Sequence, residues 1–253
     1  MSTSSAALTD SRIMLRRNLK HILRNPTTII NSALMPVVLM LLLVYVFGNA
    51  FSVGERYVEY ATPGMLLLAF TYGLSATAVS VNTDMTKGII NRFKVMNVSR
   101  GAVLNGHVVA TMLSSAVAVA VIIGMAFALG FRSSATPLDW LGAIGIIAAA
   151  AFAATWLTVG AGMAAKTPES AGIAVVPLLL LPFVSSALVP AAKMGQGIRQ
   201  FAQYQPFTPI IESVRGLLEG NPSGGYAAAA LAWCAGIAVV GYLWSRATFS
   251  KRA

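Results

Sequence analysis

The sequence has few charged residues, and none of them lies in its long apolar runs. Only 10% of the 253 residues are charged and 57% are hydrophobic, a composition that excludes an ordinary soluble domain. Because about 20 residues cover about 30 Å of hydrocarbon, six charge-free runs are each long enough to cross a bilayer: 25–54, 60–83, 101–131, 140–165, 170–192 and 220–245. No predicted span carries a carboxylate, which most ion-coupled transporters need within the membrane. Energy for uphill transport would therefore come from outside the chain.

Residues that carry chemistry are also scarce. No Gly-Lys dipeptide occurs, so the chain lacks a phosphate-binding loop and is not itself an ATPase. We also expect that it is not an enzyme of another kind. The two histidines, His21 and His107, and the single cysteine form no metal-ligand cluster, and we expect no metal or cofactor in this chain. We interpret His107 as a residue at the membrane boundary. Hydroxyls such as Ser75, Ser114 and Ser115 are typical of helix packing, and nothing here supports an intramembrane protease.

Positive charge is concentrated in alternate segments. Thirteen of the 18 lysines and arginines fall in residues 1–28, 84–100, 166–169 and 246–253. Because basic loops resist translocation, this asymmetry predicts that both termini are cytoplasmic. The net charge of +10 is thus foremost a topology signal, and we expect no nucleic-acid partner.

These patterns predict an all-α polytopic membrane protein with one transmembrane domain, residues 1–253. Six transmembrane helices are expected at about residues 28–48, 61–82, 107–130, 140–164, 170–189 and 226–245. Residues 11–24 are predicted to form an amphipathic helix on the inner membrane surface, with basic side chains at four-residue spacing: Arg12, Arg16, Lys20 and Arg24. A merely basic tail is the alternative interpretation.

The inner loop, residues 83–106, has the pattern of a short helix. Ile89, Ile90, Phe93 and Met96 fall on one helical face, and polar residues occupy the opposite face. Such a helix can rest on lipid or insert into a groove of another protein, and the pattern alone leaves both open.

The outer segment, residues 190–225, contains an uncharged stretch that is too short to span the membrane. Pro206 and Pro209 are expected to break it into two pieces, and apolar residues at spacings of three and four predict a second helical piece over Ile210–Leu218. We interpret the pair as a re-entrant or interfacial hairpin on the outer face.

Two segments together resemble one family. The loop sequence D-M-T-K-G-I-I-N-R-F-K-V-M-N-V-S-R-G-A-V-L-N-G, residues 84–106, is similar to the cytoplasmic loop of type 2 ABC exporter permeases, particularly the daunorubicin-resistance kind of drug or lipid exporter subunit. The second segment is similar to the stretch before that family's last span, and it carries Pro190, Phe201, Pro206, Pro209, Arg215, Gly216, Leu217 and Gly220. The order of spans and the chain length extend the resemblance over nearly the whole sequence.

The resemblance implies roles for both segments. The loop would be a coupling helix that docks on the ATP-binding subunit, through Asp84, Gly88, Ile89, Ile90, Arg92, Phe93, Met96, Ser99 and Arg100. Asn97 stands where the family usually has a proline before the Val-Ser-Arg step. The outer hairpin would act as a gate at the exit of the path, through Phe201, Pro206, Phe207, Pro209, Arg215 and Gly216.

The resemblance also implies the setting. The chain would be the permease subunit of an exporter in the bacterial plasma membrane, moving a hydrophobic or amphipathic solute such as a drug, an antibiotic or a lipid. ATP and Mg would bind to a separate ATPase subunit, and a second permease chain, identical or related, would complete the path. The alternative is an ion-coupled carrier or channel without an ATPase partner.

Overall fold

The computed structural model describes residues 26–46, 48, 56–86 and 100–252. Within these residues the protein is helical and contains no strand. Four of the described helices are long and apolar enough to cross a membrane: α3 (Tyr57–Thr86), α5 (Arg100–Ala128), α6 (Pro137–Ala164) and α11 (Gly224–Arg252). A further helix, α2 (Pro26–Tyr45), contains the shorter apolar stretch Leu34–Tyr45. The predicted surface helix at residues 11–24, with Arg12, Arg16, Lys20 and Arg24, lies outside the described residues.

The run predicted as the fifth span is not one continuous helix. It is divided into α7 (Pro168–Ala174), α8 (Val176–Leu180) and the 3₁₀ helix η1 (Leu181–Val184). Pro177 and Pro182 lie near the starts of the second and third pieces, where a missing N–H and a fixed φ end one helical segment and allow the next to begin. The prediction of one span over residues 170–189 is therefore corrected to a broken path.

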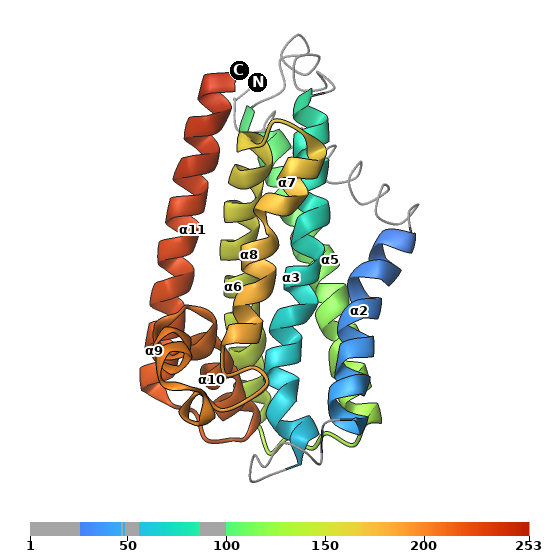
Figure 1. The fold of residues 1–253 in the computed structure, drawn as a ribbon, viewed down its shortest axis with the longest axis vertical. Coiled ribbons are helices and arrows are strands. Elements are labelled where there is room, and N and C mark those ends of the chain that lie inside the picture. Colours follow the sequence, from blue (N-terminus) through green and yellow to red (C-terminus); the bar gives the residue numbers. More distant parts are fainter. Residues whose placement is uncertain (1–25, 47, 49–55, 87–99, 253) are drawn as a thin grey trace.

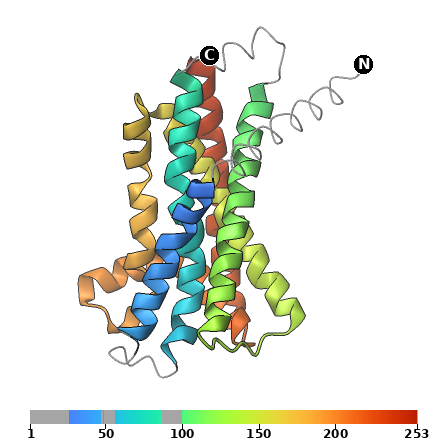
Figure 2. The same ribbon diagram turned by 90° about the vertical axis from the view of Figure 1, so that its right-hand side faces the viewer.

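Helix α3 lies at the centre of the bundle. Helices α2, α5, α6 and α7 all pack against it, and every residue from 60 to 71 is buried (Figures 1 and 2). Small residues bring the helices close: a Cβ on Gly162 of α6 would lie 2.7 Å from the carbonyl oxygen of Ala78 in α3. A Cβ on Gly241 of α11 would lie 2.6 Å from the backbone nitrogen of Leu157 in α6. The bundle therefore depends on close backbone approach, as expected for membrane helices.

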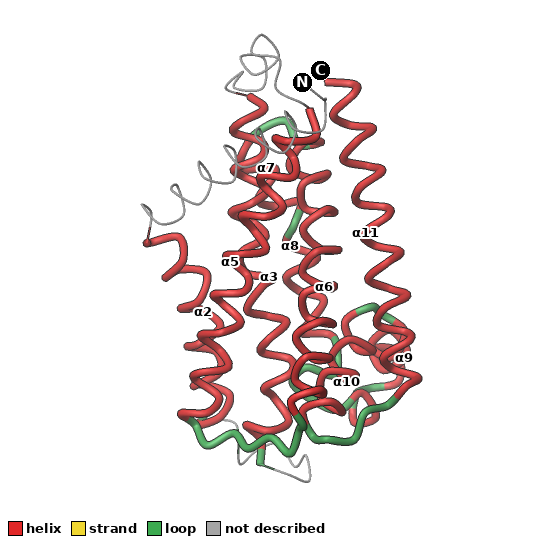
Figure 3. Tube along the Cα trace, turned by 180° about the vertical axis from the view of Figure 1, so that it is seen from behind, coloured by secondary structure: helices red, strands yellow, loops and turns green. Residues whose placement is uncertain are grey.

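The bundle has two distinct ends, which we name by their contents. At the loop end α3 ends at Thr86 and α5 begins at Arg100. The hairpin end contains α9 (Gln196–Tyr204) and α10 (Phe207–Leu218), which are preceded by the short 3₁₀ helix η2 (Ala191–Lys193) (Figure 3). The predicted outer hairpin is therefore two helices in the described structure.

One detail of the hairpin prediction was wrong. Pro206 does separate α9 from α10, but Pro209 lies in the first turn of α10 instead of breaking the segment. The first backbone N–H groups of a helix have no partner within that helix, so proline costs no hydrogen bond there. Helix α10 therefore starts three residues earlier than the predicted Ile210.

Candidate functional site

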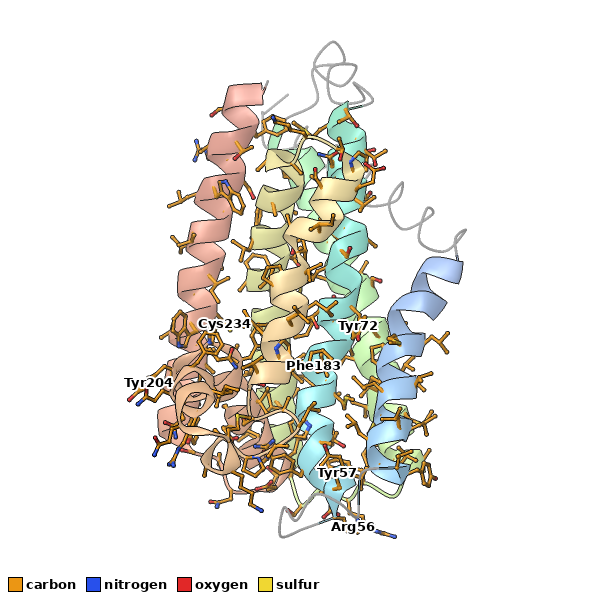
Figure 4. All side chains as sticks on the ribbon, viewed as in Figure 1. Arg56, Tyr57, Tyr72, Phe183, Tyr204 and Cys234 are labelled. Carbon is orange, nitrogen blue, oxygen red and sulfur yellow. The ribbon has the colours of Figure 1, made fainter. Side chains whose placement is uncertain are left out.

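Helix α10 is built into the bundle at the hairpin end. Nine of its residues are buried, among them Phe207, Ile211 and Val214, and it packs against α3, α6 and α11. Helix α9 is different, because its Phe201 is exposed. Its Tyr204 is also exposed, on the outside of the bundle (Figure 4). The predicted gate residues therefore divide between a surface helix and a buried helix.

Helix α10 has two charged residues, Glu212 and Arg215, and only Arg215 is buried. Its side chain is 8% exposed, and its guanidinium donates to the carbonyl oxygens of Ser186 at 2.9 Å and Tyr60 at 3.2 Å. It also pairs with Glu212 at 2.5 Å and lies over the Tyr60 ring, with Cζ 3.9 Å from the ring centroid. Burying a guanidinium is costly unless its charge and its donors are matched. These contacts supply that match and fix α10 against the start of α3.

The segment after the broken helix is held by two tyrosines from α3. The Tyr60 hydroxyl donates to the Ser186 carbonyl at 2.9 Å, and the Tyr57 hydroxyl donates to the Leu188 carbonyl at 3.1 Å. Figure 4 shows Tyr57 at the hairpin end of α3. Close packing adds to this, since a Cβ on Gly64 would lie 2.7 Å from the Ala187 carbonyl oxygen. Residues 186–188 are thus fastened to α3, and Arg215 joins the hairpin to both.

The start of α10 is capped by its own loop. The Gln205 side chain accepts from the Phe207 N–H at 3.1 Å and donates to the Thr208 hydroxyl at 3.2 Å. The Thr208 hydroxyl in turn accepts from the Ser186 N–H at 3.3 Å. Predicted gate residues Pro206 and Phe207 therefore lie in a capped turn that is also tied to the segment after η1.

The end of α10 is fixed by a glycine turn. Gly220 adopts φ +72°, and the Asn221 N–H donates to the carbonyl of the predicted gate residue Gly216 at 2.8 Å, which completes a Schellman motif. The Ser133 hydroxyl donates to the Leu218 carbonyl at 2.6 Å, so the loop between α5 and α6 also contacts this end. Both ends of α10 are therefore anchored.

Two polar atoms of this cluster have no hydrogen-bond partner in the described structure: Nε of Arg215 and Oγ of Ser186. Buried polar atoms are usually paired, and leaving one unpaired costs about 1–3 kcal/mol. The cluster at Arg215 therefore does not satisfy all of its hydrogen-bonding groups in this conformation. A rearrangement of the packing here would allow these two atoms to find partners.

At the loop end, the structure brings together two residues that flank the predicted coupling helix. Nε2 of His107 in α5 lies 3.2 Å from Oδ2 of Asp84 in α3, and both side chains are buried. Asp84 thus belongs to the last turn of α3 and not to a loop. His107 is a buried partner of Asp84 near the end of the bundle, and its predicted place at the membrane boundary stays a prediction.

The remaining predicted coupling residues are placed only in part. Arg100 begins α5, whereas Gly88, Ile89, Ile90, Arg92, Phe93, Met96 and Ser99 lie outside the described residues. In the part of the chain that the structure describes, no group of three or more His, Cys, Asp or Glu side chains is arranged to hold a metal ion.

Comparison with known proteins decides the family. The model of the family described as "ABC-2 type transporter" matches residues 9–218. This chain belongs to the ABC-2 type transporter family. The match runs from the predicted surface helix to the last residue of α10, so both the loop end and the hairpin end belong to the family's common region.

Two relatives are similar in sequence to this chain over most of their length. One is the daunorubicin resistance ABC transporter permease protein DrrB1 of Streptomyces coeruleorubidus, 28% identical over 78% of this chain and 70% of that protein. Another is the probable doxorubicin resistance ABC transporter permease protein DrrC of Mycobacterium tuberculosis, 29% identical over 94% of this chain and 88% of that protein. As an ABC-2 family member the chain is a membrane permease subunit, and the resemblance predicted from its two segments is confirmed.

Proposed function

We propose that this chain is the permease subunit of an ATP-driven exporter that moves a hydrophobic or amphipathic solute, such as a drug, an antibiotic or a lipid. The observation that carries the proposal is the family match over residues 9–218, together with relatives whose names include daunorubicin and doxorubicin resistance. The four long apolar helices supply the membrane-spanning part. We expect ATP and Mg to bind to a separate ATPase subunit, in keeping with the lack of a phosphate-binding loop in this sequence.

The proposed topology has six passes with both termini in the cytoplasm of a bacterial cell. Helix α2 and the broken segment α7–η1 complete the four long helices, and the basic residues concentrate on the side of the loop end. The hairpin end then faces outward. A broken pass is acceptable in a membrane where neighbouring helices cover its irregular backbone.

The ATPase is proposed to bind at the loop end. The apolar face formed by Ile89, Ile90, Phe93 and Met96 would fill a groove on that subunit, and the basic residues beside it would contact the groove's rim. A second permease chain, identical or related, would complete the transport path, because one such bundle is small for a bulky solute.

The test is reconstitution of this chain with its ATPase in lipid vesicles. Phe93→Asp should abolish solute-stimulated ATP hydrolysis, because it places a charge in the apolar face that would enter the groove. Asn91→Asp is the matched control, since it adds the same charge on the opposite face and should leave most of the stimulation intact. Normal coupling in the Phe93 variant would contradict the proposed docking.

The ion-coupled carrier needs testing because Asp84 lies in α3 and is buried. In the same vesicles, a carrier would concentrate solute when an ion gradient is imposed without nucleotide. The exporter would require ATP and would show no accumulation from the gradient alone.

A further inference from the structure

The loop end contains polar contacts that tie α3 to the helices on both sides of it. Asp84 contacts His107 of α5, with Oδ2 and Nε2 separated by 3.2 Å. Two residues earlier, the Asn82 side-chain amide donates to the carbonyl oxygens of Gly162 at 2.9 Å and Ala165 at 2.8 Å, at the end of α6. Helix α3 therefore contacts both α5 and α6 through polar residues in its last two turns.

These contacts are shielded from solvent. Asn82 is fully buried, and the side chains of His107 and Asp84 are 8% and 12% exposed. A contact of this kind is costly to break, because each polar group would be left in a place that water does not reach. The pairs therefore resist separation more strongly than similar pairs on a surface would.

The backbone packing at this level is equally close. Gly162 of α6 approaches Ala78 of α3 so closely that no side chain fits between them. The last carbonyl groups of any α-helix lack partners within the helix, and Asn82 donates to the carbonyl of Gly162 in the last turn of α6 and to that of Ala165, which caps this helix. Sliding or tilting α6 relative to α3 would remove both hydrogen bonds.

Deeper in the bundle, a second polar contact joins α3 to α5. The hydroxyls of Thr77 and Thr111 lie 2.9 Å apart, and the Thr111 hydroxyl is also hydrogen-bonded to the His107 carbonyl. Helices α3 and α5 are therefore joined at two levels near the loop that connects them.

We propose that Asp84, His107 and Asn82 are positioning residues that make the loop ends of α3, α5 and α6 move as one body during transport. The inference rests on the proposed function, in which an ATPase displaces the loop between α3 and α5. That displacement reaches α6 through Asn82, although α6 does not border the loop. The moving unit would thus be three helices, and not the two that the loop joins.

The first experiment needs no change to the three residues. Spin labels at Thr86 and Lys166, both exposed, report the separation of the ends of α3 and α6 in the complex reconstituted with its ATPase. Buried Cys234 is first replaced by serine so that only the labels react. The distance distribution should be the same with and without ATP while the complex transports solute. A nucleotide-dependent change in this distance would overturn the proposal.

The second experiment measures solute transported per ATP hydrolysed. His107→Ala and Asn82→Ala should lower this ratio at least about fivefold, the lower bound of a typical coupling energy, while ATP hydrolysis continues. Asn105→Ala is the control, because Asn105 lies on the same helix as His107 but is exposed. The exchanged variant Asp84→His/His107→Asp should recover part of the ratio, which a mere loss of folding would not allow.

The outcomes separate the two proposals. An unchanged ratio in the His107 and Asn82 variants would refute the three-helix unit and leave the exporter standing. If the unmodified complex fails to transport solute with ATP, the exporter itself is refuted.

Discussion

Replacing Arg215 with methionine tests whether the hairpin is held by its buried cation. The substitution keeps a long, flexible side chain but removes the two hydrogen bonds to the Tyr60 and Ser186 carbonyls and the contact with the Tyr60 ring. It also leaves Glu212 without its partner in α10. Because methionine can fill the volume of the arginine side chain, the stability that the variant loses reflects the polar contacts of Arg215.

The magnitude follows from the burial of the site. Removing one partner of a buried, hydrogen-bonded charge typically costs about 3–5 kcal/mol. Glu212 is more exposed than Arg215, at 24% against 8%, so water recovers part of its loss and the lower half of that range applies. For a chain of this size, 1 kcal/mol corresponds to about 2–4 °C, so a loss of about 3–4 kcal/mol should lower the melting temperature by about 6–16 °C.

The assay is thermal unfolding of the purified protein in lipid nanodiscs. Arg199→Met is the matched control, because it removes the same charge from the exposed face of α9 and should change the melting temperature little. Arg215→Lys should fall between the two, since it keeps the charge but lacks the planar fork that reaches two carbonyls. Equal melting temperatures for Arg215→Met and Arg199→Met would refute the reasoning.

Two further predictions concern packing and pH. Gly241→Ala should destabilise the bundle by about 1–3 kcal/mol, because its Cβ meets the backbone of Leu157. Gly236→Ala on the same helix is the control, since its Cβ meets nothing and the change should be neutral or stabilising. The free energy of unfolding of both variants, measured by denaturation, decides this. Burial raises the pKa of the Glu219 carboxyl, and this outweighs the lowering effect of Arg215. The folded protein then holds this proton more tightly than the unfolded chain, so stability is fully present below the unfolded pKa and is lost as pH rises through the folded pKa. As pH rises from the unfolded pKa through the folded pKa, the melting temperature should fall less steeply for Glu219→Gln than for the unchanged protein. Equal slopes for the two proteins would contradict the raised pKa of Glu219.

The sequence predicted most of the helical framework. Charge-free runs identified the regions of α3, α5, α6 and α11 because a membrane helix has a single strong compositional requirement. The break in the fifth run was harder to predict. Prolines often persist in membrane helices when neighbours satisfy the freed backbone, so the presence of Pro177 and Pro182 does not by itself distinguish a kink from a break.

The candidate site was predicted unevenly. Arg215 was identified through the family resemblance, but nothing in its spacing predicted that it would contact Tyr60, which is distant in the chain. The contact of His107 could have been predicted, because consecutive membrane helices commonly pack as antiparallel neighbours, which places the end of one beside the start of the next. A carboxylate in the last turn of the second span and a histidine near the start of the third are then neighbours.

Helix α3 connects the two ends of the molecule physically. Its first turn provides the Tyr60 ring and carbonyl that hold Arg215, and its last turns provide Asn82 and Asp84. Between them residues 60–71 are buried without interruption and Leu74, Ala78 and Val81 are buried further along, so α3 cannot shift at one end without disturbing neighbours packed along its length. Any displacement of the loop end must then either bend α3 or alter the contacts of Arg215 at the hairpin end. Buried polar atoms without a hydrogen-bond partner lie at both ends, namely Oδ1 of Asn82 at the loop end and Nε of Arg215 and Oγ of Ser186 at the hairpin end. Because two such atoms meet around Arg215, we expect the contacts at the hairpin end to rearrange when the loop end is displaced.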